Sequence, residues 1–217
     1  MKYIIKWTEQ NKSIGKIEWQ SNEVDANQIL AVLKYVEKKY RLTDVYIEDE
    51  MQQTWRKKDF LKMFEKEREN PHDIVIYFDG NFNHAKKQAG IGFVMYYRIH
   101  NKRFRVRENA IFTNMTSNNE AEYAALYFSL VKLEEYQIQH IPIIIRGDSL
   151  VVINQMNGEW PVYEQNFLYW IKKIEEKIKK LGLNAHYENI QRTENKEADQ
   201  LARLAIEGKE IRAEVEV

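Results

Sequence analysis

The sequence IVIYFDG, residues 74–80, decides the fold of the C-terminal two-thirds of the chain. Five consecutive apolar or aromatic residues are typical of a strand that is buried on both faces. Asp79 ends this run with a charge, and Gly80 permits either a tight exit of the backbone or the close approach of a ligand. Because Asp-Gly pairs are also common in turns, this pair alone leaves a simple turn and a functional site equally open.

A domain boundary precedes this strand. The charged, helical stretch 55–69 stops shortly before Pro71, which cannot continue a helix and biases the preceding residue away from helical angles. We therefore expect a small α+β domain over residues 1–70 and a second domain over residues 71–217. The role of the first domain is open, and substrate binding or interaction with another molecule are both candidates.

Three tryptophans stand out in the first domain: Trp7, Trp19 and Trp55. Exposed aromatic rings can stack on the bases of nucleic acids. A small domain also needs large side chains to bury enough area. We expect at least two of the three to build the core.

The second domain is predicted to contain three strands in a meander, followed by α-β-α-α-β-α. This order indicates an α/β fold with a mixed five-stranded sheet flanked by helices. The expected strands are Asp73–Asp79, Gly90–Ile99, Lys102–Thr113, Ile141–Arg146 and Asn184–Ile190. The expected helices are Asn119–Glu135, Leu150–Met156, Gln165–Leu181 and Lys196–Ile206.

Composition limits the classes of function. The 217 residues include no cysteine, which excludes disulfide-linked partners, thiol catalysis and cysteine-bound zinc, and fits a cytoplasmic location. No apolar run approaches the ~20 residues that cross a bilayer, so we expect no membrane partner. The formal net charge is zero, which weighs mildly against tight, non-specific binding of nucleic acid.

Two glutamates close together, Glu120 and Glu122, have different expected roles. Ser117 and Glu120 fit a capping box, in which the serine caps a helix and the glutamate reaches back to the backbone. Glu122 has no such role and lies among small alanines that allow a helix to approach the sheet. A carboxylate on such a face is costly unless it is paired or bound to a metal.

Two further acids lie at the edges of predicted elements. Asp148 follows the apolar run 143–145, and ligands of α/β sheets gather beyond the carboxyl ends of strands. Either Asp148 or Ser149 is also a suitable N-cap for the next helix. Asp199 lies early in the last helix, where the helix dipole alone favours an acid.

The local sequences around these acids carry a resemblance to a known family. They are YFDG at 77–80, NNEAE at 118–122, RGDS at 146–149 and NKEAD at 195–199. Together with the order of strands and helices, they make residues 74–206 similar to the type 1 ribonuclease H family, and more closely to its bacterial reverse-transcriptase-like branch. The acidic tetrad of that family then falls on Asp79, Glu122, Asp148 and Asp199.

The resemblance implies an endonuclease that cuts the RNA strand of an RNA–DNA hybrid with two Mg²⁺ or Mn²⁺ ions. Asp79 would bridge both ions, Glu122 and Asp148 would complete one site, and Asp199 would help to hold the other. Four carboxylates supply enough negative charge to hold two dications close together, and two such ions can clamp the attacking and leaving oxygens. Glu122 is also placed to contact the 2′-hydroxyl that distinguishes RNA from DNA.

The implied substrate groove involves Gly80, Asn118, Asn119 and Arg192. Many members of the family carry a histidine on a loop before the last acid, but residues 190–195 contain none. Arg192 is the candidate to bind the leaving phosphate there, and His186 is a neighbour on a predicted strand. The chain also lacks the basic protrusion of some members, for which the lysines of 165–181 or the first domain are possible replacements.

Other functions remain open from the sequence. A protein with the ribonuclease H fold that binds nucleic acid but cleaves it weakly or not at all is the main alternative. A related exonuclease is disfavoured because such enzymes place a second acid two residues after the first, where this chain has Asn81. A purely structural protein is disfavoured by the intact tetrad.

Overall fold

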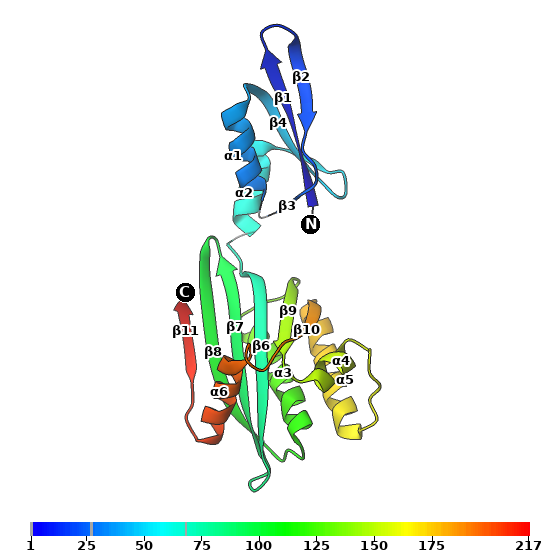
Figure 1. Ribbon diagram of the computed structural model, residues 1–217, viewed down its shortest axis with the longest axis vertical. Helices are drawn as coiled ribbons and strands as arrows, with labels where there is room; N and C mark the ends of the chain where they lie inside the picture. The colour runs from blue at the N-terminus through cyan, green and yellow to red at the C-terminus, as the bar shows by residue number, and fades with distance from the viewer. Residues whose placement is uncertain (1, 27, 68) are drawn as a thin grey trace. The chain divides into compact units, whose positions relative to one another are not determined.

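The computed structural model describes residues 2–26, 28–67 and 69–217 (Figure 1). The chain divides into two compact units, Met1–Glu69 and Asn70–Val217. None of the helices in the described residues has both the length and the apolar character needed to cross a membrane.

The first unit is an α+β structure with an antiparallel sheet in the order β2-β1-β4-β5, in which β3 also pairs with β1. Its elements are β1 (Lys2–Asn11), β2 (Gly15–Gln20), β3 (Val24–Asp25), α1 (Ile29–Lys39), β4 (Leu42–Asp49), β5 (Thr54–Arg56) and α2 (Lys57–Glu67). The predicted helix over 55–69 is therefore shorter at its start, because Thr54–Arg56 pairs with β4 instead.

Two of the three tryptophans help to build the core of this unit, as expected. Trp7 is 9% exposed and belongs to the buried cluster, and Trp55 packs against that cluster. Trp19 is 44% exposed, and its ring lies 6.1 Å from that of Tyr40.

The second unit is a mixed sheet in the order β10-β9-β6-β7-β8-β11. Strands β6, β7 and β8 form the predicted antiparallel meander, β9 runs parallel to β6, and β10 runs parallel to β9. The elements are β6 (His72–Asn83), β7 (Gln88–Ile99), β8 (Lys102–Thr113), α3 (Asn118–Glu135), β9 (Pro142–Gly147), α4 (Leu150–Met156), α5 (Gln165–Leu181), β10 (Asn184–Asn189), α6 (Lys196–Ile206) and β11 (Arg212–Glu216). The predicted α/β fold class is confirmed.

A sixth strand, β11, extends the five predicted strands. It pairs antiparallel with β8 from Arg212↔Glu108 to Glu216↔Phe104. The turn before it is held by Asn109, whose Nδ2 donates to Leu201 O at 3.0 Å and to Lys209 O at 2.9 Å, and whose Oδ1 accepts from Ile211 N at 2.7 Å. The sequence did not indicate this strand because it has no apolar run, and all five of its residues are exposed.

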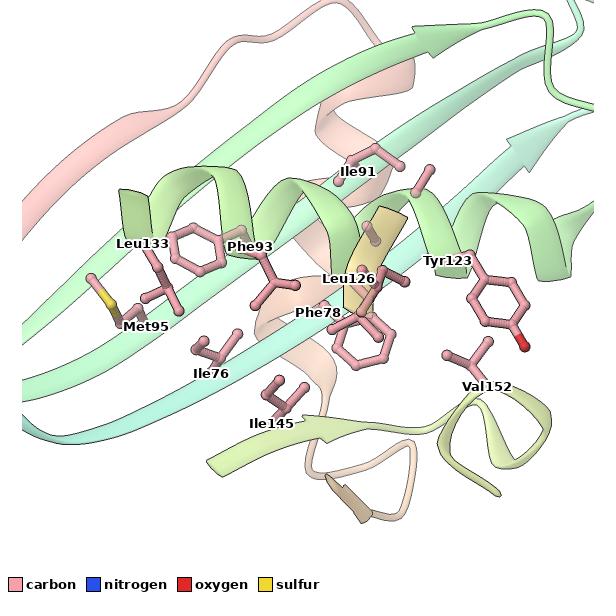
Figure 2. Packing of buried hydrophobic residues seen from close by; sticks show 14 of the residues in the cluster. Ile76, Phe78, Ile91, Phe93, Met95, Tyr123, Leu126, Leu133, Ile145 and Val152 are labelled. Carbon is pink, nitrogen blue, oxygen red and sulfur yellow. The ribbon is translucent and has the colours of Figure 1, made fainter. Parts of the chain in front are cut away.

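One face of the sheet carries the main hydrophobic core beneath α3 (Figure 2). Phe78, Phe93 and Leu126 are completely buried there. Burying side chains of this size contributes about 1.5–3 kcal/mol each to the free energy of unfolding. This face therefore fixes α3, and with it Glu122, against the end of β6.

The opposite face of the sheet is packed by α6. A Cβ atom at Gly92 would lie 2.0 Å from Ala198 O, and one at Gly90 would lie 2.0 Å from Ala202 O. Only glycine leaves room for the helix backbone at these two positions. The close approach places the first turn of α6, which carries Asp199, directly over β7.

Candidate metal centre

Two parallel strands deliver Asp79 and Asp148 to one edge of the sheet. The pairing of β6 with β9 ends at Tyr77↔Arg146, so each aspartate lies two residues beyond the last pair. The carboxyl ends of parallel strands meet at the same edge. The predicted position of both residues beyond their strands is therefore what brings them together.

Glu122 joins them because Gly80 allows α3 to touch the end of β6. A Cβ atom at Gly80 would lie 2.3 Å from the carbonyl carbon of Ala121. Gly80 N donates to Glu122 Oε2 at 3.2 Å. The glycine after Asp79 thus serves a close approach between backbones, which is one of the two roles that the sequence left open.

The neighbouring Glu120 has a structural role, as the capping argument predicted. Ser117 Oγ accepts from Glu120 N at 3.1 Å at the start of α3. The Glu120 carboxylate reaches back to Thr116 N at 2.8 Å, one residue earlier than in the usual capping box, and also accepts from Trp170 Nε1 at 3.3 Å. These contacts occupy Glu120 and leave Glu122 as the glutamate of the cluster.

Asp79, Glu122 and Asp148 form a compact group of carboxylates. One oxygen from each lies within 4.8 Å of the others, and both Asp79 and Glu122 are only 6% exposed. Burial, and then the charges of Asp148 and Asp199, raise the pKa of Asp79 to about 7. Burial, and then Asp79 and Asp148, hold the pKa of Glu122 well above its usual range, against the opposing effect of Gly80 N–H.

This donor set fits a hard divalent cation. Carboxylate oxygens are the ligands that Mg²⁺ and Mn²⁺ prefer. Without a cation, burial raises the pKa values of Asp79 and Glu122, and repulsion among the three converging carboxylates raises them further. The three carboxylates are able to hold a metal ion, and a bound cation would offset the repulsion among them.

Asp148 is not the cap of α4. Ser149 is the N-cap residue, and its Oγ accepts from Val152 N at 3.5 Å. The Asp148 carboxylate instead accepts from Asn195 Nδ2 at 3.1 Å. Of the two candidates that the sequence offered for capping, the structure uses the serine.

Asp199 lies apart from the compact group, although it lines the same cleft. Its Oδ2 lies 3.0 Å from Arg203 Nε, and its Oδ1 lies 3.3 Å from Arg192 Nη2. The side chain of Asp199 is 18% exposed, so these ion pairs are partly shielded from water. The four predicted acids therefore converge on one cleft as three clustered carboxylates and one that is already paired.

The cleft that contains the acids has a volume of about 350 Å³. Three of the four predicted substrate-binding residues, Gly80, Asn118 and Arg192, line it, and Asn119 is not among its lining residues. His186, the other candidate for the missing loop histidine, is exposed on β10 and lies 3.7 Å from Glu188. The remaining lining residues are Asp79, Asn81, Glu122, Asp148, Ser149 and Asp199.

Several basic side chains of the second unit form ion pairs with neighbouring acids. Arg105 and Arg107 on β8 lie 3.2 Å and 3.0 Å from Glu197 Oε1 on α6. Lys177 and Lys180 on α5 both pair with Glu134 at 2.6 Å. These contacts tie helices to their neighbours, and reduce the charge that these residues present to a ligand.

Asn195 is the residue of this region that sequence reasoning missed. It is 1% exposed and donates to the Asp148 carboxylate. An asparagine at the start of a helix reads as an ordinary N-cap. The only signal for another role was its position four residues before Asp199.

The sheet order, the two flanking helices and the acids at the ends of β6 and β9 define a ribonuclease H fold. Solved structures of this class match more than half of the chain. LC11-RNase H1, isolated from compost by a metagenomic approach and crystallised with an RNA/DNA hybrid, is 28% identical. The match has a TM-score of 0.55 and covers 63% of this chain and 98% of that one.

A second structure of the same class is the N-terminal RNase H domain of rv2228c from Mycobacterium tuberculosis. It is 26% identical and has a TM-score of 0.53, and the match covers 62% of this chain and 94% of that one.

The chain belongs to the reverse transcriptase-like family, whose model matches residues 77–205. It is also 42% identical over 162 residues to the uncharacterized protein YpeP of Bacillus subtilis (strain 168). That match covers 75% of this chain and 71% of that protein. The predicted resemblance to type 1 ribonucleases H is confirmed.

Proposed function

We propose that this protein is a metal-dependent endonuclease that hydrolyses the RNA strand of RNA–DNA hybrids. The observation that carries the proposal is the convergence of Asp79, Glu122 and Asp148, with oxygens within 4.8 Å of one another in an open cleft. The ribonuclease H fold supports it, as does the hybrid bound by the similar LC11-RNase H1. The fold supports the proposed class of substrate, and the carboxylates support the proposed class of chemistry.

In this proposal the cleft holds two Mg²⁺ or Mn²⁺ ions. Such ions, when bound, lower the pKa of a bound water and stabilise the leaving oxygen of a phosphodiester. Asp79 on β6, Glu122 on α3 and Asp148 just after β9 would supply the oxygens, and α3 and β9 both pack against β6. Asp199, which lines the same cleft, would help to hold the second ion.

The polar residues at the rim of the cleft would orient the substrate. Asn118 Oδ1 accepts from Phe82 N at 3.3 Å, so its Nδ2 would be the group that donates to a sugar or base. Arg192 is 74% exposed at the cleft, where its guanidinium suits the leaving phosphate. Gly80 and Asn119 would contribute to the same groove, and Glu122 would contact the 2′-hydroxyl.

A second candidate function has one specific observation in its favour. Asp199 is paired with Arg203 and Arg192 and lies outside the compact group of carboxylates. If those ion pairs persisted with substrate bound, the second ion would lose a ligand. The protein would then bind nucleic acid with weak cleavage or none.

Cleavage of an RNA–DNA hybrid labelled on the RNA strand, in the presence of Mg²⁺ or Mn²⁺, tests the proposal. The variant Asp79→Asn removes a charge from the centre of the cluster and should abolish cleavage while hybrid binding is retained. Asp73→Asn is the matched control, because Asp73 lies on the same strand with a side chain that is 70% exposed. Its positive φ of 54° is one that asparagine tolerates.

The outcomes separate the two candidate functions. Divalent-dependent cleavage by the native chain and by Asp73→Asn, but not by Asp79→Asn, supports the nuclease. Hybrid binding without cleavage at any divalent concentration favours the binding protein. Cleavage that survives Asp79→Asn would show that this cluster is not the site of chemistry.

A further inference from the structure

Asn195 directly precedes α6 but does not cap the helix with its side chain, as asparagine often does at this position. It is the N-cap residue, yet its side chain makes no hydrogen bond to the helix backbone. It is also 1% exposed, whereas asparagine is mostly a surface residue. A buried amide that does not cap its helix needs another partner.

The partners of this amide lie at the fork where β6 and β9 separate. Asn195 Nδ2 donates to Phe78 O at 2.9 Å and to Asp148 Oδ1 at 3.1 Å. Because a carbonyl and a carboxylate both accept hydrogen bonds, they require the NH₂ group, and so fix which way the amide points. The side chain thus bridges the residue before Asp79 to the carboxylate of Asp148.

The backbone of Asn195 makes the third connection. Asp199 N donates to Asn195 O at 3.1 Å in the first turn of α6. One residue therefore contacts the strand that carries Asp79, the Asp148 carboxylate and the helical turn that carries Asp199. Among the described residues, Asn195 Oδ1 is buried without a hydrogen-bond partner. Because an unpaired buried acceptor lowers the stability of the fold, its presence here calls for an explanation.

We propose that Asn195 is a positioning residue for the metal centre, which rests on the proposed function above. A carboxylate among like charges turns away from them unless something holds it, and Asn195 holds one Asp148 oxygen. The carboxylate that it holds is one of the three that converge within 4.8 Å. Asn195 does not line the acidic cleft, so it acts on metal and not on substrate.

Asn109 provides a matched control at the opposite end of α6. It is likewise buried, at 8% exposure, and makes three hydrogen bonds that hold the turn into β11. Its partners are Leu201, Lys209 and Ile211, none of which belongs to the acidic cleft. Loss of either amide should destabilise the fold, but only Asn195 should affect metal.

The experiment measures Mn²⁺ affinity by titration calorimetry on the full chain, for the native protein, Asn195→Ala and Asn109→Ala. Loss of a residue that orients a metal ligand commonly weakens metal binding by about 10–100-fold. We expect that loss for Asn195→Ala and native affinity for Asn109→Ala. With a hybrid substrate, kcat should fall in Asn195→Ala while KM stays constant, because the side chain does not face the cleft.

Native Mn²⁺ affinity in Asn195→Ala, or an equal loss in Asn109→Ala, would overturn the proposal. If Asn195→Ala does not fold, Asn195→Ser replaces it: serine is favoured at helix starts, and its hydroxyl is one bond shorter than the amide nitrogen. Failure of the native chain to bind Mn²⁺ would overturn the proposed function, and this inference with it. Native binding without an Asn195 effect would overturn this inference alone.

Discussion

Helices α3 and α6 lie on opposite faces of one sheet, and each carries one acid of the cleft. In both cases a glycine on the underlying strand allows the helix backbone to approach closely. Gly80 lets α3 touch β6, and Gly92 lets α6 touch β7. The electrostatic results differ. Glu122 on α3 is almost fully buried with a raised pKa, whereas Asp199 on α6 is paired with two arginines.

The comparison shows that different residues determine the position of each helix and the electrostatic environment of its carboxylate. The glycines decide where each helix lies, and the residues around each carboxylate decide whether it needs a cation. Among the described residues Glu122 forms no ion pair, and its carboxylate accepts a hydrogen bond from Gly80 N. Asp199 already forms two ion pairs. In the metal-free protein, the uncompensated negative charge of the cleft therefore lies mainly on the side of α3.

The largest expected effect comes from breaking the close approach itself. Gly92→Val would place side-chain atoms within the backbone of α6, since even a Cβ atom there lies 2.0 Å from Ala198 O. Overpacking against a backbone that cannot yield should lower the free energy of unfolding by about 3 kcal/mol or more. Urea denaturation measures the change, with Ala213→Val on exposed β11 as the neutral control. A well-folded Gly92→Val variant would show that α6 can move away from the sheet.

The next effect compares the two acids. Glu122→Gln should reduce hybrid cleavage by at least about 100-fold, because losing a metal ligand costs more than losing a residue that orients one. Asp199→Asn should reduce it less, because Asp199 lies outside the compact group. Single-turnover assays at saturating Mg²⁺ measure both rates. The control is Glu120→Gln, which should retain cleavage; a larger effect at Asp199 than at Glu122 would contradict the comparison.

A smaller effect concerns pH in the metal-free protein. The pKa of Asp79 is raised from 3.8 to about 7, so its contribution to stability is full at pH below about 4 and is lost as pH rises through 7. Compared with Asp79→Asn, the native chain should lose on the order of 2 kcal/mol between pH 5 and pH 8. Chemical denaturation in EDTA at each pH measures it. A pH-independent difference between the two proteins would contradict the raised pKa.

The smallest effect is expected from substitution of Arg203, which forms an ion pair with Asp199. Arg203 and Asp199 are four residues apart on α6, and the arginine side chain is 56% exposed. Such pairs contribute about 0.3–0.5 kcal/mol, so Arg203→Gln should barely change the free energy of unfolding. Urea denaturation at low and high salt measures it. A loss above about 1 kcal/mol would show that Asp199 is charged at a much greater cost than its exposure suggests.

The acids of the cluster could be predicted from sequence because each depends on local order. Asp79 and Asp148 follow apolar runs, so their positions at the strand ends are a consequence of strand direction. Glu122 could be separated from Glu120 because Ser117 lies three residues before Glu120. The fold class followed from the same alternation of apolar strands and amphipathic helices.

Other features depend on contacts between distant residues and had no local signal. The amide of Asn195 reaches residues 47 and 117 positions away, so a sequence pattern at residue 195 suggests only a cap. Strand β11 has no apolar run of its own and exists because β8 offers an edge and Asn109 holds the turn. The two ion pairs of Asp199 are intermediate in this respect. Arg203 lies four residues away on the same helix, whereas Arg192 lies seven residues away on the preceding loop.

Strand β11 has a further consequence for how the molecule meets its neighbours. The edge of a sheet offers unpaired backbone groups to any other strand, and charged side chains on an edge discourage that pairing. β11 covers the edge of β8 and replaces it with Arg212, Glu214 and Glu216, all exposed. A long, partly apolar strand is thereby shielded by a short, charged one, which protects the sheet from aggregation at that side.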